Sequence, residues 1–333
     1  MRKDAQMKKF IFLIGISGSG KSTLSESYTN DEHIWLSSDD LRIQLYGSLE
    51  EGNKHNGELF QQMQQMALDY LTNNNGTVIY DATNLSRKQR AHMYRLVKTI
   101  DKTVVESVIM FRNPTTAKKW NNTRTGYAVV PEDIIEQQFM RLQIPRIGVD
   151  TDIITAEGES WFTPTDEEIM SLWDSRDVIK TLANMAIPEI AEILQLNYAP
   201  HDTQYHYESI DAHINMVANY TKSINPNLLL PAIFHDMGKG YVKGRGQNEG
   251  TLGKYLDHNL VSAQLLLNFM LFNTDSKTTT ENIESVELVY QHMAAHQLNW
   301  YHTEKFQRKN NINTALLEDL KQFAQIDNKM RLH

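Results

Sequence analysis

The chain has 333 residues, no cysteine and a formal net charge of −8. Without cysteines it has no disulfides, thiolate zinc sites or thiol nucleophiles, so any metal must be held by histidine, carboxylate or water. The 41% hydrophobic content fits a globular protein, and no apolar run approaches the roughly 18 residues that a membrane span needs. The acidic balance argues against a strongly basic duplex-binding surface, but allows local contacts with a nucleic-acid end.

The first half of the chain alternates between strand and helix patterns. This alternation predicts a parallel sheet with helices on both faces. Residues 150–164 contain Gly158, Pro164 and several acidic residues, and are interpreted as a junction. From about Asp166 onward the patterns are helical, with no convincing strand. We therefore expect an α/β domain over residues 1–160 and an all-helical domain over 166–333. The predicted strands are 10–14, 33–37, 77–80 and 104–111, and the predicted helices are 39–46, 57–72 and 86–100.

Residues 15–22 read Gly-Ile-Ser-Gly-Ser-Gly-Lys-Ser, directly after the first predicted strand. This is the P-loop spacing G-x-x-x-x-G-K-[ST], in which backbone N–H groups surround a phosphate at a helix N-terminus. The alternative is an ordinary glycine-rich turn. The three glycines are expected to supply positive φ. Lys21 is expected to reach the β- and γ-phosphates and Ser22 to bind Mg²⁺. The predicted ATP-binding residues are Gly15, Gly18, Gly20, Lys21, Ser22 and Thr23.

Acidic and basic residues follow the second predicted strand. Asp39 and Asp40 come directly after it, and Arg42 lies about one helical turn further on. Phosphoryl transfer to a hydroxyl needs a carboxylate that accepts the proton and cations that hold charge. Asp39 is the candidate base, and Arg42 the candidate anchor for an acceptor phosphate. The alternative is that Asp39 or Asp40 is an N-cap.

Two further charged residues belong to the same hypothesis. Asp81 ends the third predicted strand, where it can assist Mg²⁺ through water or orient the acceptor; the alternative is a turn-forming aspartate. Arg124 follows a predicted helix, where it can close over the phosphates and stabilise transition-state charge. A solvated surface arginine is the alternative.

These motifs resemble the kinase domain of phage-type polynucleotide 5′-kinases over about the first 150 residues. The resemblance implies that Asp39 is the general base for a 5′-hydroxyl, that Arg42 binds the phosphate on its 3′ side, and that Arg124 contacts ATP. The lid departs from the phage pattern, because Asn121 or Thr125 stands where a second arginine is expected. Small-molecule kinases of the same P-loop class share parts of the pattern, so the acceptor stays open. The resemblance rests on Gly15–Ser22, residues 38–42, 81–85 and 122–126, and Pro131.

A second constellation lies in the helical half. His235 and Asp236 form an adjacent pair at the end of an apolar run, and an imidazole and a carboxylate there can bind one metal. His213 falls on the apolar face of its predicted helix, as does Asp327. A carboxylate on an apolar face must be paired or bind a metal. The alternative is a set of satisfied core residues.

The order His, His-Asp-x-Gly-Lys and late Asp resembles the HD-domain metal-dependent phosphohydrolases over about residues 200–330. The resemblance implies a divalent metal, such as Mn²⁺, Fe²⁺, Co²⁺, Ni²⁺ or Zn²⁺, that activates water to attack phosphorus. It implies the metal ligands His213, His235, Asp236 and Asp327, the phosphate-contacting Lys239, and His258 and His292 for a second metal or the substrate phosphate. His296 shares the face of His292, and His201, His206 and Glu208 either contact substrate or lie in a surface loop.

The two resemblances together predict a bifunctional end-healing enzyme. It would phosphorylate 5′-hydroxyl ends with ATP and Mg²⁺, and remove a 3′-phosphate or 2′,3′-cyclic phosphate. RNA is favoured over DNA, and a nucleic-acid ligase is the expected partner. No signal peptide is seen, and a cytoplasmic location is expected. Two alternatives stay open. The first is a nucleotide-metabolism or signalling enzyme in which the P-loop half phosphorylates a small molecule and the HD half hydrolyses a free nucleotide. The second is a non-catalytic ATP-driven switch whose HD site is structural.

Overall fold

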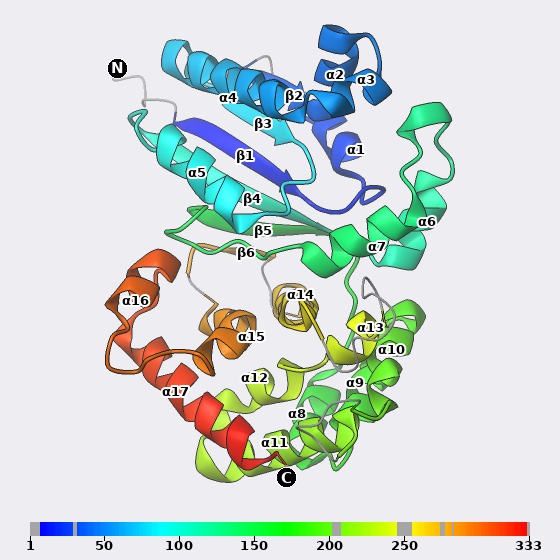
Figure 1. The fold of residues 1–333 in the computed structure, drawn as a ribbon, viewed down its shortest axis with the longest axis vertical. Coiled ribbons are helices and arrows are strands. Elements are labelled where there is room, and N and C mark those ends of the chain that lie inside the picture. The colour runs from blue at the N-terminus through cyan, green and yellow to red at the C-terminus, as the bar shows by residue number, and fades with distance from the viewer. Residues whose placement is uncertain are drawn as a thin grey trace. The chain divides into compact units, whose positions relative to one another are not determined.

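The computed structural model describes residues 7–28, 32–201, 208–244, 255–273, 277–281 and 283–331. The chain divides into two compact units, coloured by residue number in Figure 1. The first unit contains Met1–Phe139, Pro145–Glu159 and Lys277–Asn282, and the second contains Met140–Ile144, Ser160–Ser276 and Ile283–His333. Within the described ranges, every helix is too short or too polar to cross a lipid bilayer.

The first unit is built on one sheet with the strand order β2-β3-β1-β4-β5-β6 among the described residues. The first five strands are parallel, and β6 is antiparallel at the edge. The P-loop strand β1 lies between β3 and β4. Open α/β sheets bind ligands at the carboxyl ends of their strands, where the chain leaves to either side. The strands are β1 (Lys8–Ile14), β2 (His33–Ser37), β3 (Thr77–Asp81), β4 (Thr103–Phe111), β5 (Ile153–Gly158) and β6 (Thr278–Thr279).

Side chains alternate between the two faces of this sheet, as the pleat requires. Ile11 and Leu13 pack on the face that also buries Leu24 from the helix after the P-loop. Phe12 and Tyr80 belong to an aromatic cluster on the other face, with ring centroids 6.0 Å apart. The helices of this unit are α1 (Lys21–Glu26), α2 (Ser38–Tyr46), α3 (Leu49–Lys54), α4 (Asn56–Asn73), α5 (Arg87–Val97), α6 (Pro114–Asn121) and α7 (Glu132–Arg141), with a 3₁₀ turn η1 (Gly126–Ala128).

The four strands predicted from the sequence are present, and the N-terminal half is α/β with a mostly parallel sheet. The chain passes from the first unit to the second between Glu159 and Ser160, inside the predicted junction at residues 150–164, but that segment also contains a strand that was not predicted, because β5 occupies Ile153–Gly158 and pairs with β4. β6 is also a strand where only helices were expected. β5 is a short strand of mixed apolar and polar residues, β6 contains only Thr278 and Thr279, and both are stabilised by neighbours distant in sequence. Thr155 Oγ1 donates to Glu106 Oε1 at 2.5 Å, for example.

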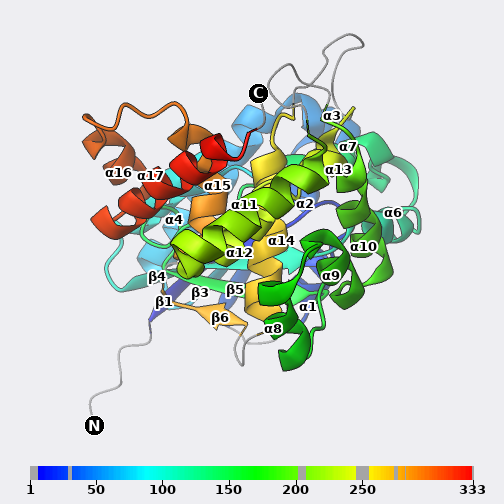
Figure 2. The ribbon, with the colours of Figure 1, turned by 90° about the horizontal axis from the view of Figure 1, so that it is seen from below.

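The second unit is helical. Its central helix α14 is apolar on all sides, which is the pattern of a helix surrounded by others. Figure 2 shows α11 and α12 passing over α14. The helices are α8 (Asp166–Asp174), α9 (Val178–Met185), α10 (Pro188–Gln195), α11 (Ile210–Ile224), α12 (Leu229–Phe234), α13 (Lys239–Val242), α14 (His258–Phe272), α15 (Glu284–Ala295), α16 (Glu304–Asn310) and α17 (Thr314–Lys329), with 3₁₀ turns η2 (Leu196–Tyr198) and η3 (Pro226–Leu228).

Asp152 ties the start of β5 to β4 and α5. Its carboxylate accepts hydrogen bonds from Val105 N at 2.8 Å, the Tyr94 hydroxyl at 2.7 Å and Lys98 Nζ at 3.0 Å. Burial opposes the negative charge, but these donors outweigh it and hold the pKa of Asp152 below its ordinary value. The ionised carboxylate therefore stabilises the folded first unit.

We expect Asp152→Asn to lower the free energy of unfolding by about 1–3 kcal/mol at pH 7, because it removes hydrogen bonds to a charged acceptor. The folded-state pKa is depressed, so this contribution is present above the unfolded pKa of about 3.9 and is lost as the pH falls through the folded pKa. Urea unfolding followed by circular dichroism at pH 7 and pH 3 measures the difference. The exposed Asp101→Asn is the matched control, and an equal loss for Asp152→Asn at both pH values would contradict the account.

Candidate functional site

The P-loop turn depends on its glycines for two different reasons. Gly18 and Gly20 have φ values of 78° and 94°, and Gly20 caps α1 in the left-handed region. A Cβ at Gly18 would also lie 2.3 Å from the carbonyl oxygen of Ala117. The expectation of positive φ at Gly15 is wrong: Gly15 is needed for space, since a Cβ there would lie 2.6 Å from Ser19 Oγ.

Lys21 points back into the loop. Its Nζ donates to the carbonyl oxygens of Gly15 and Ile16, at 3.0 and 2.9 Å. Burial lowers the pKa of Lys21 to about 8, because desolvation outweighs the nearby carboxylates. Lys21 is half-buried, and the two hydrogen bonds of its ammonium group go to uncharged carbonyl oxygens, so it attracts an anion such as phosphate.

The predicted phosphoryl-transfer residues lie around one cleft of about 260 Å³, which we name the transfer cleft. Thr23 is exposed on α1 and does not line this cleft. The sequence-predicted residues that do line it are Lys21, Ser22, Asp39, Arg42, Asp81 and Arg124.

Asp81 and Ser22 form a polar pair at the base of the transfer cleft. Ser22 Oγ donates to Asp81 Oδ2 at 3.1 Å, and Trp35 Nε1 donates to the same oxygen at 3.3 Å. Burial raises the pKa of Asp81, partly offset by Lys21. A hydroxyl and a carboxylate at this distance fit the oxygen ligands and water-mediated contacts that Mg²⁺ prefers.

Asp39 and Arg42 form an ion pair one helical turn apart. Arg42 Nη1 lies 2.9 Å from Asp39 Oδ1, and Arg42 Nη2 donates to Asn56 Oδ1 at 2.7 Å. The Asp39 side chain is 63% exposed, whereas that of Arg42 is 10% exposed. The alternative N-cap role of Asp39 or Asp40 is wrong, because the Ser37 side chain caps α2 by accepting from Asp40 N. Asp39 is therefore free to meet an acceptor hydroxyl.

The segment after α6 carries Arg124 to the transfer cleft. Arg124 is exposed, and its charge contributes to the lowered pKa of Lys21. Asn121 is buried at the base of this segment, where its side chain bonds both the N–H and the carbonyl of Val130, at 2.9 and 2.8 Å. Asn121 thus closes the loop that presents Arg124.

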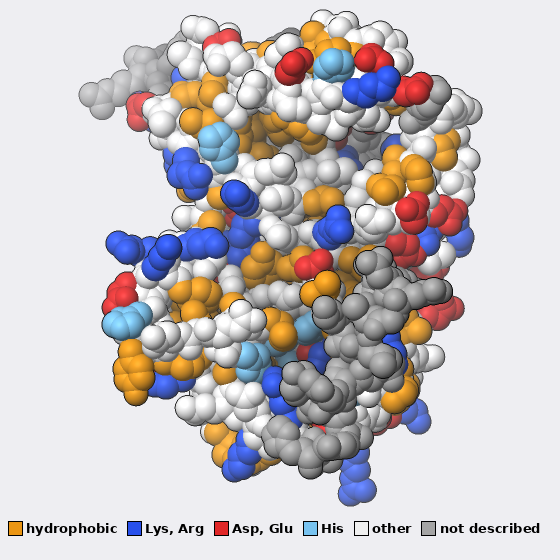
Figure 3. All heavy atoms as spheres, in the orientation of Figure 1, with side chains coloured by type: hydrophobic (Ala, Val, Ile, Leu, Met, Phe, Trp, Pro, Cys, Tyr) orange, Lys and Arg blue, Asp and Glu red, His pale blue; other side chains and the backbone are white. Residues whose placement is uncertain are grey.

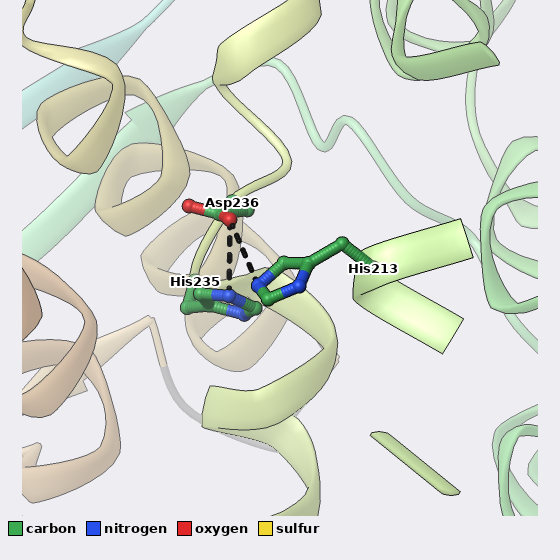
Figure 4. A group of neighbouring side chains, drawn as sticks. All are labelled: His213, His235 and Asp236. Carbon is green, nitrogen blue, oxygen red and sulfur yellow. Dashed lines mark ion pairs between the residues drawn. The ribbon is translucent and has the colours of Figure 1, made fainter. Parts of the chain in front are cut away.

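In the second unit, a group of histidines and aspartates meets in the interior, which we name the histidine centre. Figure 4 shows His213 and His235 beside the carboxylate of Asp236. His213 Nε2 lies 3.6 Å from Asp236 Oδ2, and His235 Nε2 lies 3.1 Å from the same oxygen. Asp327 Oδ1 lies 2.8 Å from His213 Nε2 and 3.8 Å from His235 Nε2. All four side chains are buried.

The second carboxylate oxygen of Asp236 faces another pair of histidines, His258 and His292. Asp236 Oδ1 lies 3.1 Å from His258 Nε2 and 3.6 Å from His292 Nε2. His213, His235 and Asp236 form one set of atoms close enough to share a metal ion, and Asp236, His258 and His292 form another. If both sets held a metal ion, Asp236 would contribute Oδ2 to the first and Oδ1 to the second.

The ring orientations fit metal binding. The Nδ1 atoms of His235, His258 and His292 each hydrogen-bond a backbone carbonyl, of Ala232, Tyr255 and Val289 respectively, at 2.9, 2.6 and 2.7 Å. Such a bond places the proton on Nδ1 and leaves the Nε2 lone pair for a metal. The buried Nε2 of His235 has no hydrogen-bond partner among the described residues. The donor set therefore fits a divalent transition metal.

Neighbouring groups hold these side chains in place. Asp327 Oδ2 lies 2.8 Å from His296 Nε2 and 2.9 Å from Arg331 Nη2, which leaves Oδ1 facing His213. Glu208 Oε1 lies 3.2 Å from His213 Nδ1. Lys239 Nζ lies 2.6 Å from Asp236 Oδ2 and 3.3 Å from His201 Nε2. His206 lies outside the described residues.

The histidine centre contains two carboxylates that are held in their ionised form, which favours the binding of a cation. Burial opposes ionisation of Asp236 and Asp327, but His235, Lys239 and His258 hold the pKa of Asp236 well below the ordinary range, and the neighbouring imidazoles do the same for the pKa of Asp327. Burial lowers the pKa of His292 to about 4, so this ring is neutral at pH 7. The negative charge of Asp236 overcomes the burial of His235 and raises its pKa. A metal ion would replace the proton that Asp236 stabilises on the His235 imidazole.

Gly238 explains the spacing of the His-Asp-x-Gly-Lys motif. A Cβ at this position would lie 2.3 Å from the carbonyl oxygen of His258. Gly238 N also donates to Ser262 Oγ at 2.9 Å. The glycine thus allows the start of α14 to approach the turn after α12, which brings His258 to Asp236.

The structure brings together His213, His235, Asp236, Lys239, His258, His292 and Asp327, as the sequence predicted. Two further contacts were missed. One is the ion pair between Arg331 and Asp327, which the i, i+4 spacing of the two residues could have predicted. Gln138 accepts from Ser17 N in the P-loop at 2.7 Å, and no local sequence signal marks it.

Comparison with known protein families supports the interpretation of the N-terminal part. Residues 10–145 match the family model described as AAA domain. Together with the sheet and the P-loop, this match shows a P-loop kinase-like domain, which is followed by a helical region. No curated protein matches the chain.

Several solved structures share partial similarity with the chain. Two structures of a Pnkp1/Rnl/Hen1 complex align at 22% and 20% identity over 38% and 42% of this chain, with TM-scores of 0.32 and 0.36. The alignments cover 44% and 46% of those chains, less than half of their length. A structure from the PezAT toxin–antitoxin system of Streptococcus pneumoniae aligns at 14% identity over 47% of this chain and 70% of that chain, with a TM-score of 0.37.

If Asp236 bridges two ions, the unmodified protein should bind two Mn²⁺ or Ni²⁺ ions per chain, and His292→Gln should bind one. Asp236→Asn should lose both, since it removes the shared charge. Isothermal titration calorimetry and elemental analysis measure the stoichiometry. The exposed His302→Gln is the control and should keep two ions. Full metal content in Asp236→Asn would rule out the bridging arrangement.

Proposed function

We propose that this protein is a bifunctional end-healing enzyme that prepares broken RNA for ligation. One activity transfers phosphate from ATP to a 5′-hydroxyl end, and the other hydrolyses a 3′-phosphate or 2′,3′-cyclic phosphate. The observation that carries the proposal is the presence, in one chain, of the transfer cleft and of a separate buried His/Asp cluster suited to a divalent metal.

The kinase half of the proposal rests on the ion pair beside the P-loop. Asp39 is exposed and held by Arg42, so its carboxylate can accept the proton of an acceptor hydroxyl while Arg42 meets an acceptor phosphate. Lys21 and Arg124 bring positive charge to the transferring phosphoryl group, where negative charge is redistributed in the transition state. Ser22 and Asp81 would hold Mg²⁺. ATP is the donor that this arrangement fits.

The hydrolase half rests on the histidine centre. His213, His235, Asp236 and Asp327 would hold one divalent ion, and His258 and His292 would hold a second ion together with Asp236. When bound, such an ion lowers the pKa of water and offsets charge on phosphoryl oxygens. Lys239 lies at the edge of this group, where its ammonium can orient a substrate phosphate.

Broken RNA connects the two activities chemically. Cleavage by attack of the 2′-hydroxyl leaves a 5′-hydroxyl and a 2′,3′-cyclic phosphate. A ligase that joins 5′-phosphate to 3′-hydroxyl needs both ends converted. A nucleic-acid ligase is therefore the partner that the proposed pair of activities implies.

The test is an end-modification assay on RNA and DNA oligonucleotides. Substrates carry a 5′-hydroxyl with a 3′-phosphate or a 2′,3′-cyclic phosphate, and reactions contain ATP and Mg²⁺, with or without Mn²⁺ or Ni²⁺. Lys21→Ala should reduce 5′-phosphorylation by at least about a hundredfold, because it removes a preorganised charge on the transferring group. The same variant should keep 3′-end hydrolysis.

Asp236→Asn should give the opposite result, with 3′-end hydrolysis lost and 5′-phosphorylation kept. Lys102→Gln changes the charge of an exposed lysine and should keep both activities. Phosphorylation of free nucleosides or sugars with no action on oligonucleotide ends would favour a small-molecule enzyme. Loss of both activities in either variant would contradict two independent sites.

A further inference from the structure

A second cavity of about 790 Å³ opens beside the transfer cleft in the first unit. Its volume lies within the range of about 300–1,000 Å³ that is typical of ligand sites. The two spaces share Arg42, Phe60, Ala82 and Thr83 in their linings. A molecule that presents a hydroxyl to Asp39 can therefore continue into the second cavity without leaving the protein surface.

The second cavity lies between α4 and α5, above the aromatic face of the sheet. Phe12 and Tyr80 line it from the sheet, Gln64 lines it from α4, and Lys88 and His92 line it from α5. In Figure 3 this part of the surface is mainly orange and white, with blue side chains at its edge. The cavity thus offers apolar and polar surface together with positive charge at its edge.

The charge of the lining favours an anionic ligand. The chain has a formal net charge of −8, yet no carboxylate is among the described residues that line this cavity. Its cationic residues are Arg42, Lys88 and Arg90, of which Arg90 is paired with the buried Asp150. Among the neutral lining residues, Gln64 and Gln89 offer amide donors. Such a lining attracts a phosphate backbone, because it brings positive charge without a carboxylate among its described residues.

Arg42 and Phe60 stand where the two spaces meet. The guanidinium carbon of Arg42 lies 5.8 Å from the centre of the Phe60 ring, and Phe60 is 37% exposed. Arg42 Nε is buried and has no hydrogen-bond partner among the described residues, although Nη1 and Nη2 are both paired. An exposed aromatic ring beside an arginine is the combination on which single-stranded nucleic acids bind, by base stacking and phosphate contact.

Lys88, Gln89 and His92 extend this surface along α5. They are exposed, and Lys88 and His92 lie four residues apart, so they share one side of the helix. The loop before α5 is fixed by Asn84, whose Nδ2 donates to the carbonyls of Leu13, Tyr80 and Ala82 at 2.8, 3.0 and 3.2 Å. These residues therefore stand at a set distance from the transfer cleft.

We propose that the second cavity is an extended acceptor subsite for a single strand, and that it binds the nucleotides on the 3′ side of the nucleoside that is phosphorylated. Phe60 stacks on a base, and Lys88 pairs with a backbone phosphate. This inference rests on the proposed 5′-kinase function and names its acceptor as a strand of several nucleotides. A small-molecule acceptor would fill the transfer cleft alone.

The kinetic test compares acceptors of increasing length. KM for 5′-phosphorylation is measured with a nucleoside 3′-monophosphate, a dinucleotide and a tetranucleotide, all with a 5′-hydroxyl. In the unmodified protein KM should fall with length. Lys88→Gln should raise the KM of the tetranucleotide several-fold more than that of the nucleoside 3′-monophosphate. It should also reduce the salt dependence of the tetranucleotide KM by a slope of about 0.7, the value for one lost phosphate contact on a single strand.

The controls separate this inference from the proposed function. Lys102→Gln makes the same change at an exposed lysine outside the cavity and should behave like the unmodified protein. Binding of a 3′-fluorescein tetranucleotide, measured by anisotropy, requires no catalysis and should weaken in Lys88→Gln and in Phe60→Ala. A KM independent of length, or equal anisotropy binding in Lys88→Gln and Lys102→Gln, would overturn the subsite. Failure of phosphorylation with strand binding still dependent on Lys88 would overturn the kinase function and leave the strand subsite supported.

Discussion

Each unit of this protein contains a charge that is shielded from water, and the two charges have opposite sign: Lys21 is half-buried, and Asp236 is buried. Lys21 is enclosed by the P-loop and is held by two carbonyl oxygens. Asp236 is enclosed by helices of the second unit and is held by imidazoles and Lys239. For Asp236, removing one charged partner from such a buried ion pair costs about 3–5 kcal/mol, because the remaining charge is left without water. These charges therefore constrain which residues can surround them.

The sign of each buried charge indicates the ligand that suits it. The carbonyl oxygens around Lys21 neutralise none of its charge, and burial lowers its pKa to about 8. A phosphate would restore the charged state that burial opposes. At Asp236 the protein supplies histidines whose Nδ1 atoms are fixed on carbonyls, so that Nε2 faces the carboxylate. A divalent cation is the species that satisfies both the carboxylates and the Nε2 lone pairs.

The sequence predicted the parts of the structure in which local pattern and long-range packing agree. The P-loop, the buried strands and the apolar helix faces carrying His213 and Asp327 are of this kind, because burial imposes a period that can be read along the chain. β5 was missed, since Ile153–Gly158 is short, mixes apolar and polar residues, and is stabilised as a strand by its pairing with β4 and β6. The positive φ expected at Gly15 was also wrong. Glycine is required there because Ser19 and Met110 pack against the backbone and leave no space for a Cβ atom. Contacts of this kind depend on residues that meet only in the folded chain.

The two adjoining spaces of the first unit, the transfer cleft and the second cavity, differ in their carboxylates. Asp39 and Asp81 line the transfer cleft, where in the proposed kinase reaction Asp39 would accept a proton and Asp81 would help to hold Mg²⁺. The adjoining second cavity has no carboxylate among its described lining residues. A carboxylate there would repel a phosphate backbone, whereas one beside the reacting hydroxyl is required for proton transfer. Arg42 belongs to both spaces, because it pairs with Asp39 and also lines the second cavity. A change at Arg42 would therefore alter both the ion pair with Asp39 and the binding of the proposed acceptor, whereas a change at Lys88 would alter the binding of the acceptor alone.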